Sequence, residues 1–209
     1  MGHLLLLRHG QSQWNLENRF TGWIDVPLST RGGEEALAAA QQLSTYRLNR
    51  AFTSKLVRAI DTLRIVLAAI GQEQIPIEEN QALNERMYGD LQGLNKDETV
   101  NQYGAKQVEV WRRSYDVRPP GGESLKDTAA RVLPYYQERI QPAVEKGDTV
   151  LIVAHGNSLR ALVMHLEDLS SQQIVDLTIP TGALVVYALA DQGKLVRQDR
   201  DAASRARKL

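Results

Sequence analysis

The chain has 209 residues, and its 25 basic and 25 acidic side chains give a formal net charge of zero at pH 7. A neutral chain has no global field to attract nucleic acid or an anionic membrane surface, so an anion site would need local clustering of cations. Cysteine is absent, which excludes disulfides, thiolate nucleophiles and cysteine-ligated metal centres. No apolar run reaches the roughly 18 residues of a membrane span, and residues 1–7 lack a secretory pattern. We therefore expect a cytoplasmic protein without a membrane partner.

The first predicted strand covers residues 4–7, an apolar run that ends at Arg8, His9 and Gly10. Such a short run is typical of a buried strand, and ligands in open α/β sheets bind at the carboxyl ends of strands. A nucleophilic imidazole beside a guanidinium, with a glycine that permits close backbone approach, suits phosphoryl transfer. Alternatively, the tripeptide is only a strand end with an incidental surface histidine.

Helices and strands then alternate along the chain, which predicts a mainly parallel sheet with helices on both faces. The further predicted strands are residues 51–53, 76–78, 149–154 and 184–189. The predicted helices are residues 34–43, 54–70, 99–114 with a break at Gly104, 124–145 and 159–166. We expect a single domain over residues 1–199 and a basic tail without assigned structure over residues 200–209.

Three serines are predicted to cap helices, because a hydroxyl at such a position accepts from the free amides of the first turn. They are Ser29, Ser54 and Ser124. A cap at Ser54 would place Arg58 in the first turns of its helix, near the sheet edge that carries His9.

A second arrangement of strand, histidine and glycine follows residues 149–154, where the chain reads His155-Gly156-Asn157. If the two strands are neighbours, His9 and His155 meet. With Arg8 and Arg58 they would form a cationic pocket near helix amino termini, which suits a phosphate dianion. The histidines could instead be simple helix-start residues or zinc ligands. Because no third ligand stands at a recognisable spacing and arginines are adjacent, we expect no metal.

Eight sequence blocks resemble the cofactor-dependent phosphoglycerate mutases of the histidine phosphatase superfamily. The resemblance runs from about Leu4 to Tyr187. Arg8-His9-Gly10 and the late histidine mark only the superfamily, whereas residues 83–96 and Trp111-Arg112-Arg113 point to the mutases. The blocks are residues 8–10, 20–23, 83–86, 88–89, 91–96, 111–113, 122–125 and 154–160.

This resemblance implies a three-layer α/β/α sandwich and an isomerase of glycolysis and gluconeogenesis that interconverts 3-phosphoglycerate and 2-phosphoglycerate, primed by 2,3-bisphosphoglycerate. It implies that His9 is the phosphorylated nucleophile, that His155 stabilises the transferring phosphoryl group and that Glu85 is the acid/base. The residues implied to hold the transferred phosphoryl group are Arg8, Asn15, Arg58, Gly156 and Asn157. Those implied to hold the other phosphate and the carboxylate are Ser12, Thr21, Gly22, Tyr88, Lys96, Arg112 and Arg113.

The residue types fit these roles physically. An imidazole attacks only when unprotonated, and the charges of Arg8 and Arg58 disfavour a further positive charge on His9. A carboxylate such as Glu85 can accept the proton of a substrate hydroxyl and return it. Glu85 could instead simply pair with Arg86.

Three other functions stay open at this point. A phosphatase of the same superfamily would share His9 and His155 but pass the phosphoryl group to water, and a bisphosphoglycerate synthase would differ in its phosphoryl donor. A non-catalytic phospho-ligand binder would need no acid/base. Gln11, Met87 and Ala183-Leu184 depart from residues common in the family, and a homo-oligomer is neither indicated nor excluded.

Overall fold

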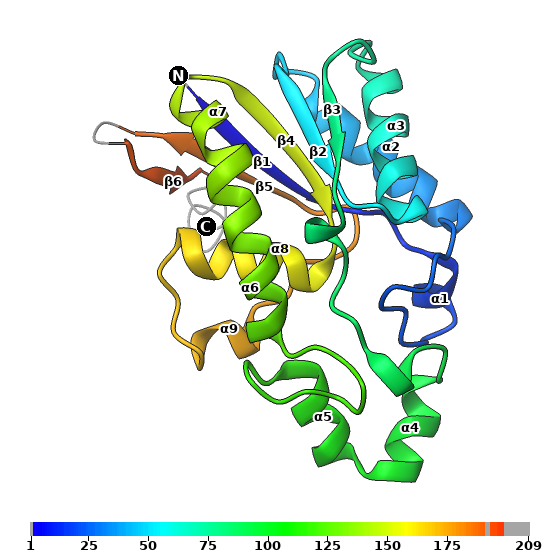
Figure 1. Cartoon of the computed structure of the whole chain (residues 1–209). Helices are drawn as coiled ribbons and strands as arrows, with labels where there is room; N and C mark the ends of the chain where they lie inside the picture. The colour runs from blue at the N-terminus through cyan, green and yellow to red at the C-terminus, as the bar shows by residue number, and fades with distance from the viewer. Residues whose placement is uncertain (1, 191–192, 199–209) are drawn as a thin grey trace, which may run out of the picture.

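The computed structural model describes residues 2–190 and 193–198 (Figure 1), so the predicted tail over residues 200–209 lies outside the described residues. Within these residues one sheet has the strand order β3-β2-β4-β1-β5-β6. The strands are β1 His3–Arg8, β2 Arg50–Thr53, β3 Ile77–Glu79, β4 Thr149–Ala154, β5 Leu184–Leu189 and β6 Leu195–Arg197. The first four are parallel, and β5 and β6 add antiparallel pairs at one edge. The predicted mainly parallel sheet is confirmed, while β6 was not predicted.

Helices cover both faces of the sheet (Figure 1), which confirms the three-layer fold. On one face lie α2 Thr30–Leu43 and α3 Val57–Ala69; on the other lie α6 Leu125–Tyr135, α7 Gln141–Glu145 and α8 Gly156–Leu166. In β1, Leu5 and Leu7 pack toward α2 and α3, and Leu4 and Leu6 pack toward α6 and α8. A strand covered on both faces buries every side chain, which explains the unbroken run of leucines.

The predicted helix over residues 124–145 forms, but with a wider turn inside it. Ser124 caps α6 with a capping box, and a π-helical segment at Tyr136–Ile140 joins α6 to α7. Pro142 has no amide hydrogen, and in a regular α-helix its ring would clash with the carbonyl of Glu138. We attribute the π turn to this proline, because such turns absorb local breaks in helical hydrogen bonding.

The expected cap at Ser54 is wrong, whereas that at Ser29 is confirmed. Helix α3 begins only at Val57, whose amide donates to Asp25 Oδ1 at 2.7 Å. The Ser54 hydroxyl accepts from the Leu56 amide before the helix starts. Arg58 nevertheless occupies the first turn of α3, as predicted.

Two helices lie beyond the carboxyl ends of the parallel strands (Figure 1). They are α4 Lys96–Tyr103 and α5 Ala105–Arg113, and they are separated at Gly104 as predicted. Phe20, Leu91, Val108 and Trp111 form a hydrophobic cluster apart from the two that flank the sheet. The remaining short elements are α1 Gln13–Leu16, α9 Gln173–Asp176 and the 3₁₀ helices Gln81–Leu83 and Gly89–Leu91.

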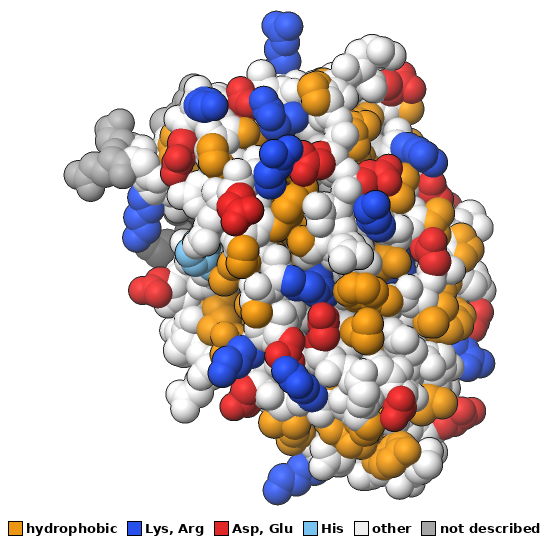
Figure 2. Space-filling model, in the orientation of Figure 1, with side chains coloured by type: hydrophobic (Ala, Val, Ile, Leu, Met, Phe, Trp, Pro, Cys, Tyr) orange, Lys and Arg blue, Asp and Glu red, His pale blue; other side chains and the backbone are white. Residues whose placement is uncertain are grey.

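The described helices include none with the length and apolar character needed to cross a membrane. On the face shown in Figure 2, basic and acidic side chains are interspersed among apolar ones. This distribution fits the zero net charge.

Candidate active site

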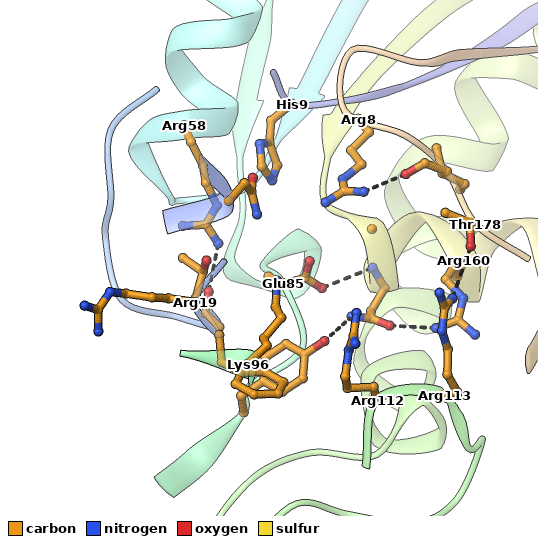
Figure 3. Close-up of a pocket in the computed structure, with 18 of the residues that line it drawn as sticks. Arg8, His9, Arg19, Arg58, Glu85, Lys96, Arg112, Arg113, Arg160 and Thr178 are labelled. Atoms are coloured by element: carbon orange, nitrogen blue, oxygen red, sulfur yellow. Dashed lines mark hydrogen bonds between the residues drawn. The ribbon is translucent and has the colours of Figure 1, made fainter. Parts of the chain in front are cut away.

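A cavity of about 200 Å³ lies at the carboxyl ends of β1 and β4 (Figure 3). Helices α4 and α5 lie beyond the same end of the sheet (Figure 1). Seven cationic side chains line it, against one carboxylate, that of Glu85. The cations are Arg8, Arg19, Arg58, Lys96, Arg112, Arg113 and Arg160. This is the local clustering that a neutral chain needs to attract an anion.

The two predicted histidines come together at this edge. Because β1 pairs in parallel with β4, Arg8 stands opposite Ala154, and the next residue of each strand is a histidine. The ring centroids of His9 and His155 are 4.8 Å apart, with 59° between the ring planes. The expectation that the rings meet is confirmed.

Hydrogen bonding fixes the tautomer of His9. Its Nδ1 lies 2.6 Å from the carbonyl oxygen of Gly10, and because a carbonyl only accepts, Nδ1 carries the proton. Nε2 therefore holds the free lone pair. The backbone beside it is closely packed, since a Cβ at Gly10 would lie 2.1 Å from the Gly32 carbonyl oxygen of α2.

Both imidazoles are held neutral. Burial lowers the pKa of His9 well below its ordinary value, and the positive charges of Arg58 and Arg8 lower it further. Burial likewise lowers the pKa of His155, with Arg58 as the next cause. His9 therefore keeps its nucleophilic lone pair at neutral pH.

His155 differs from His9 in its position and its partners. Its Nε2 lies 2.7 Å from the Ser54 hydroxyl, and its buried Nδ1 has no hydrogen-bond partner in the described part of the chain. It does not line the cavity, but its ring contacts that of His9.

Arg8 and Arg58 are fixed by backbone carbonyls. Arg58 donates through Nη2 to Gly22 at 2.8 Å, and Arg8 donates through Nη1 to Ile179 at 2.7 Å. Burial lowers the pKa of Arg58 to about 10 and also lowers that of Arg8. The buried Nε of Arg8 and the Thr21 hydroxyl find no partner among the described residues, so both can bind an incoming anion.

Glu85 lies at the amino end of α8 (Figure 3). Its Oε1 accepts from the backbone amides of Arg86 at 2.8 Å and Asn157 at 3.1 Å. The guanidinium of Arg86 instead donates to the Arg112 carbonyl and lies over the Tyr88 ring. The alternative in which Glu85 serves mainly to pair with the Arg86 side chain is therefore not the arrangement observed.

The opposite wall supplies a second group of cations. Lys96 begins α4, and Arg112 and Arg113 end α5. Burial, followed by the charge of Arg112, lowers the pKa of Lys96. Arg113 donates to the Thr178 hydroxyl at 3.1 Å. These cations come from a segment distant in sequence from the His9 end.

All the predicted site residues except Ser12 and His155 line the cavity. Ser12 is buried, and its hydroxyl accepts from the Asn15 amide as the cap of α1. A cap needs the same short hydroxyl side chain as a phosphate contact, so the sequence alone does not separate the two uses.

The cavity also contains residues that the sequence analysis missed: Arg19, Phe20, Arg160, Leu177, Thr178 and Ile179. Arg160 stands one helical turn after Asn157, donates to Asn157 Oδ1 at 2.9 Å and donates to the Ile174 carbonyl at 2.6 Å. The helical spacing from Asn157 was a usable signal. Residues 177–179 carry no such signal, because only the return of the chain to β5 brings them to the cavity.

The described residues include no group of three or more histidine, aspartate or glutamate side chains placed to hold a metal ion.

Residues 4–201 match the family described as the histidine phosphatase superfamily, branch 1. The chain belongs to this superfamily.

Curated relatives are similar over nearly the whole chain. The 2,3-bisphosphoglycerate-dependent phosphoglycerate mutase of Parvibaculum lavamentivorans is 57% identical, over 94% of each chain. The phosphoglycerate mutase of Schizosaccharomyces pombe is 52% identical, also over 94% of each chain.

Two solved structures with the same fold are more distant in sequence than these relatives. Bacillus stearothermophilus YhfR is 29% identical with a TM-score of 0.82, covering 93% of this chain and 94% of its own. A mycobacterial glucosyl-3-phosphoglycerate phosphatase complexed with VO3 is 28% identical with a TM-score of 0.81, covering 95% of this chain and 97% of its own.

Proposed function

We propose that this chain is a 2,3-bisphosphoglycerate-dependent phosphoglycerate mutase that interconverts 3-phosphoglycerate and 2-phosphoglycerate. Curated relatives with this name are 46–57% identical to it. The observation that carries the proposal is a neutral His9, with Nε2 unprotonated, in a cavity with two separate groups of cations. Such a reaction belongs to glycolysis and gluconeogenesis, which would place the enzyme in the cytoplasm.

His9 is the proposed nucleophile. Its Nε2 attacks phosphorus, so that a P–N bond forms while the P–O bond to the donor oxygen breaks. Glu85, as the carboxylic acid, gives its proton to the leaving oxygen. In the return step the Glu85 carboxylate takes the proton of the accepting hydroxyl, the new P–O bond forms and the P–N bond breaks.

The two groups of cations have different proposed roles. Arg8 and Arg58 lie near His9 and offset charge on the transferring oxygens. Lys96, Arg112 and Arg113 on the opposite wall would hold the phosphate that is not transferred and the carboxylate. The donor set suits 2,3-bisphosphoglycerate, because buried polar atoms at Arg8 and Thr21 have no partner in the described chain. When bound, that compound supplies the phosphoryl group that first loads His9.

The competing function is a phosphatase, which the name of one solved relative favours. We expect isomer exchange between the two phosphoglycerates, measured with 2,3-bisphosphoglycerate in EDTA, to exceed inorganic phosphate release by at least about 100-fold. The expectation follows from the second group of cations, since a phosphatase needs only the group near His9. Comparable rates would overturn the mutase assignment, and so would exchange that needs no bisphosphoglycerate or that stops in EDTA.

A further inference from the structure

Glu85 belongs to an irregular segment, not to a strand or a long helix. It follows the 3₁₀ helix Gln81–Leu83 and precedes the 3₁₀ helix Gly89–Leu91. A catalytic group must be held to within about 0.5 Å of its productive position, and buried loop carbonyls need hydrogen-bond donors. The surroundings of Glu85 must therefore supply those donors.

Arg131 on α6 supplies most of them. It donates through Nη1 to the carbonyls of Ala82 at 2.7 Å and Asn84 at 3.0 Å, and through Nη2 to the carbonyl of Glu85 at 2.9 Å. The planar guanidinium offers five donors in a fixed geometry. One side chain thus fixes three carbonyls around Glu85. The indole of Trp23 donates to the same Glu85 carbonyl.

Glu123 holds both Arg131 and the other side of the segment. Its two carboxylate oxygens accept from Arg131 Nε at 3.0 Å and Nη2 at 2.8 Å. Its Oε2 also accepts from the Met87 amide at 3.1 Å, and its own amide donates to the Met87 carbonyl. The two side chains of this ion pair are only 20% and 21% exposed, so solvent screens the pair less than it screens a surface pair.

We propose that Arg131, backed by Glu123, is a positioning residue for Glu85. It holds the segment so that Glu85 Oε1 stays on the amides of Arg86 and Asn157, which leaves Oε2 to exchange a proton with the substrate. Arg131 does not line the cavity. The inference rests on the acid/base role proposed for Glu85.

The test uses Arg131→Met and Arg131→Lys in the full chain. A displacement of about 1 Å in a catalytic group can cost about 100-fold in rate. We expect kcat for isomer exchange to fall 10- to 100-fold in Arg131→Met, with KM changed less than about threefold. Lysine keeps the charge but lacks the fork, so Arg131→Lys should recover only part of the rate.

A matched control is available further along the same helical run. Arg139 forms an ion pair with Glu78 at 2.9 Å and is 58% exposed. Arg139→Met removes an arginine and its ion pair without affecting the Glu85 segment, so its kcat should stay within about twofold of the original. The phosphohistidine formed per chain at the end point of loading gives the folded, active fraction of each variant, which separates misfolding from slower chemistry.

The decisive measurement is a double-mutant cycle with Glu85→Gln. If Arg131 acts through the Glu85 carboxyl group, Arg131→Met should add less than about threefold to the loss already caused by Glu85→Gln. Multiplicative losses, or an unchanged kcat in Arg131→Met, would overturn the positioning role. If Glu85→Gln itself kept full exchange, the acid/base proposal would fail instead, whatever the Arg131 variants showed.

Discussion

The carboxyl ends of β1 and β4 have the same residue pattern, an apolar strand followed by histidine and glycine, yet their histidines are held differently. The Nδ1 of His9 lies on the Gly10 carbonyl, which can only accept a hydrogen bond. The Nε2 of His155 lies on the Ser54 hydroxyl, which can donate or accept. Only His9 lines the cavity.

This difference separates a nucleophile from its neighbour. The carbonyl at His9 selects one tautomer and leaves Nε2 unprotonated, whereas the hydroxyl at His155 allows either tautomer. Two identical sequence patterns therefore give one ring prepared to accept a phosphoryl group and one that lies against it.

The largest effect is expected for His9→Ala. With no imidazole nitrogen to form the P–N bond, exchange should fall by about 10⁴-fold or more. Acid-labile phosphate on the protein, measured after incubation with labelled 2,3-bisphosphoglycerate, should fall to background. Circular dichroism would verify that the variant is folded. Labelled phosphate at full stoichiometry in His9→Ala would show that the two histidines had been assigned the wrong way round.

A smaller loss is expected for His155→Gln, which keeps a polar side chain of similar size. Phosphate should still load His9 to the original stoichiometry, but about 10²- to 10³-fold more slowly, as when one stabilising group for a transition state is removed. Rapid-quench measurement of labelled phosphoenzyme gives both numbers. Loading at the original rate would mean that His155 only packs against His9.

The weakest expected effect is a dependence of stability on pH. Burial, then Arg58, lowers the pKa of both histidines in the folded chain, while the unfolded value is about 6.5. The unfolded chain then binds more protons below about pH 6.5. The free energy of unfolding should be constant above about pH 7.5 and fall on acidification, by up to about 1.4 kcal/mol per pH unit for each histidine.

Urea unfolding between pH 8 and pH 5 measures this slope. The His155→Gln variant, with one buried histidine fewer, should show a slope smaller by up to about 1.4 kcal/mol per pH unit. Equal slopes in the variant and the original chain would contradict the conclusion that His155 is held neutral.

Much of the fold could be predicted because its signals are local. The leucines of β1 predict a buried strand, and Ser124 predicts the start of α6, each from only a few neighbouring residues. The four-residue helices and β6 are too short to give a periodic pattern. Ser54 was misassigned because Asp25, distant in sequence, supplies the acceptor at the start of α3.

The residues of the site also fall into those that a local sequence signal predicts and those that it does not. His9 and His155 follow recognisable strands, so the rule that ligands bind at the carboxyl edge of a sheet finds both of them. Arg131 binds backbone carbonyls 46 to 49 residues away in sequence. A carbonyl looks the same at every residue, so nothing in the sequence marks which ones need a guanidinium.

The close packing between the His9 turn and α2 limits how the molecule can vary. A methyl group at position 10 would meet the Gly32 carbonyl at 2.1 Å, and one at position 32 would meet the Gln11 carbonyl at the same distance. Substitution at either residue would push α2 and the turn apart. No residue of α2 lines the cavity. Gly32 of this helix is nevertheless constrained to remain glycine, because it packs against the turn that carries His9.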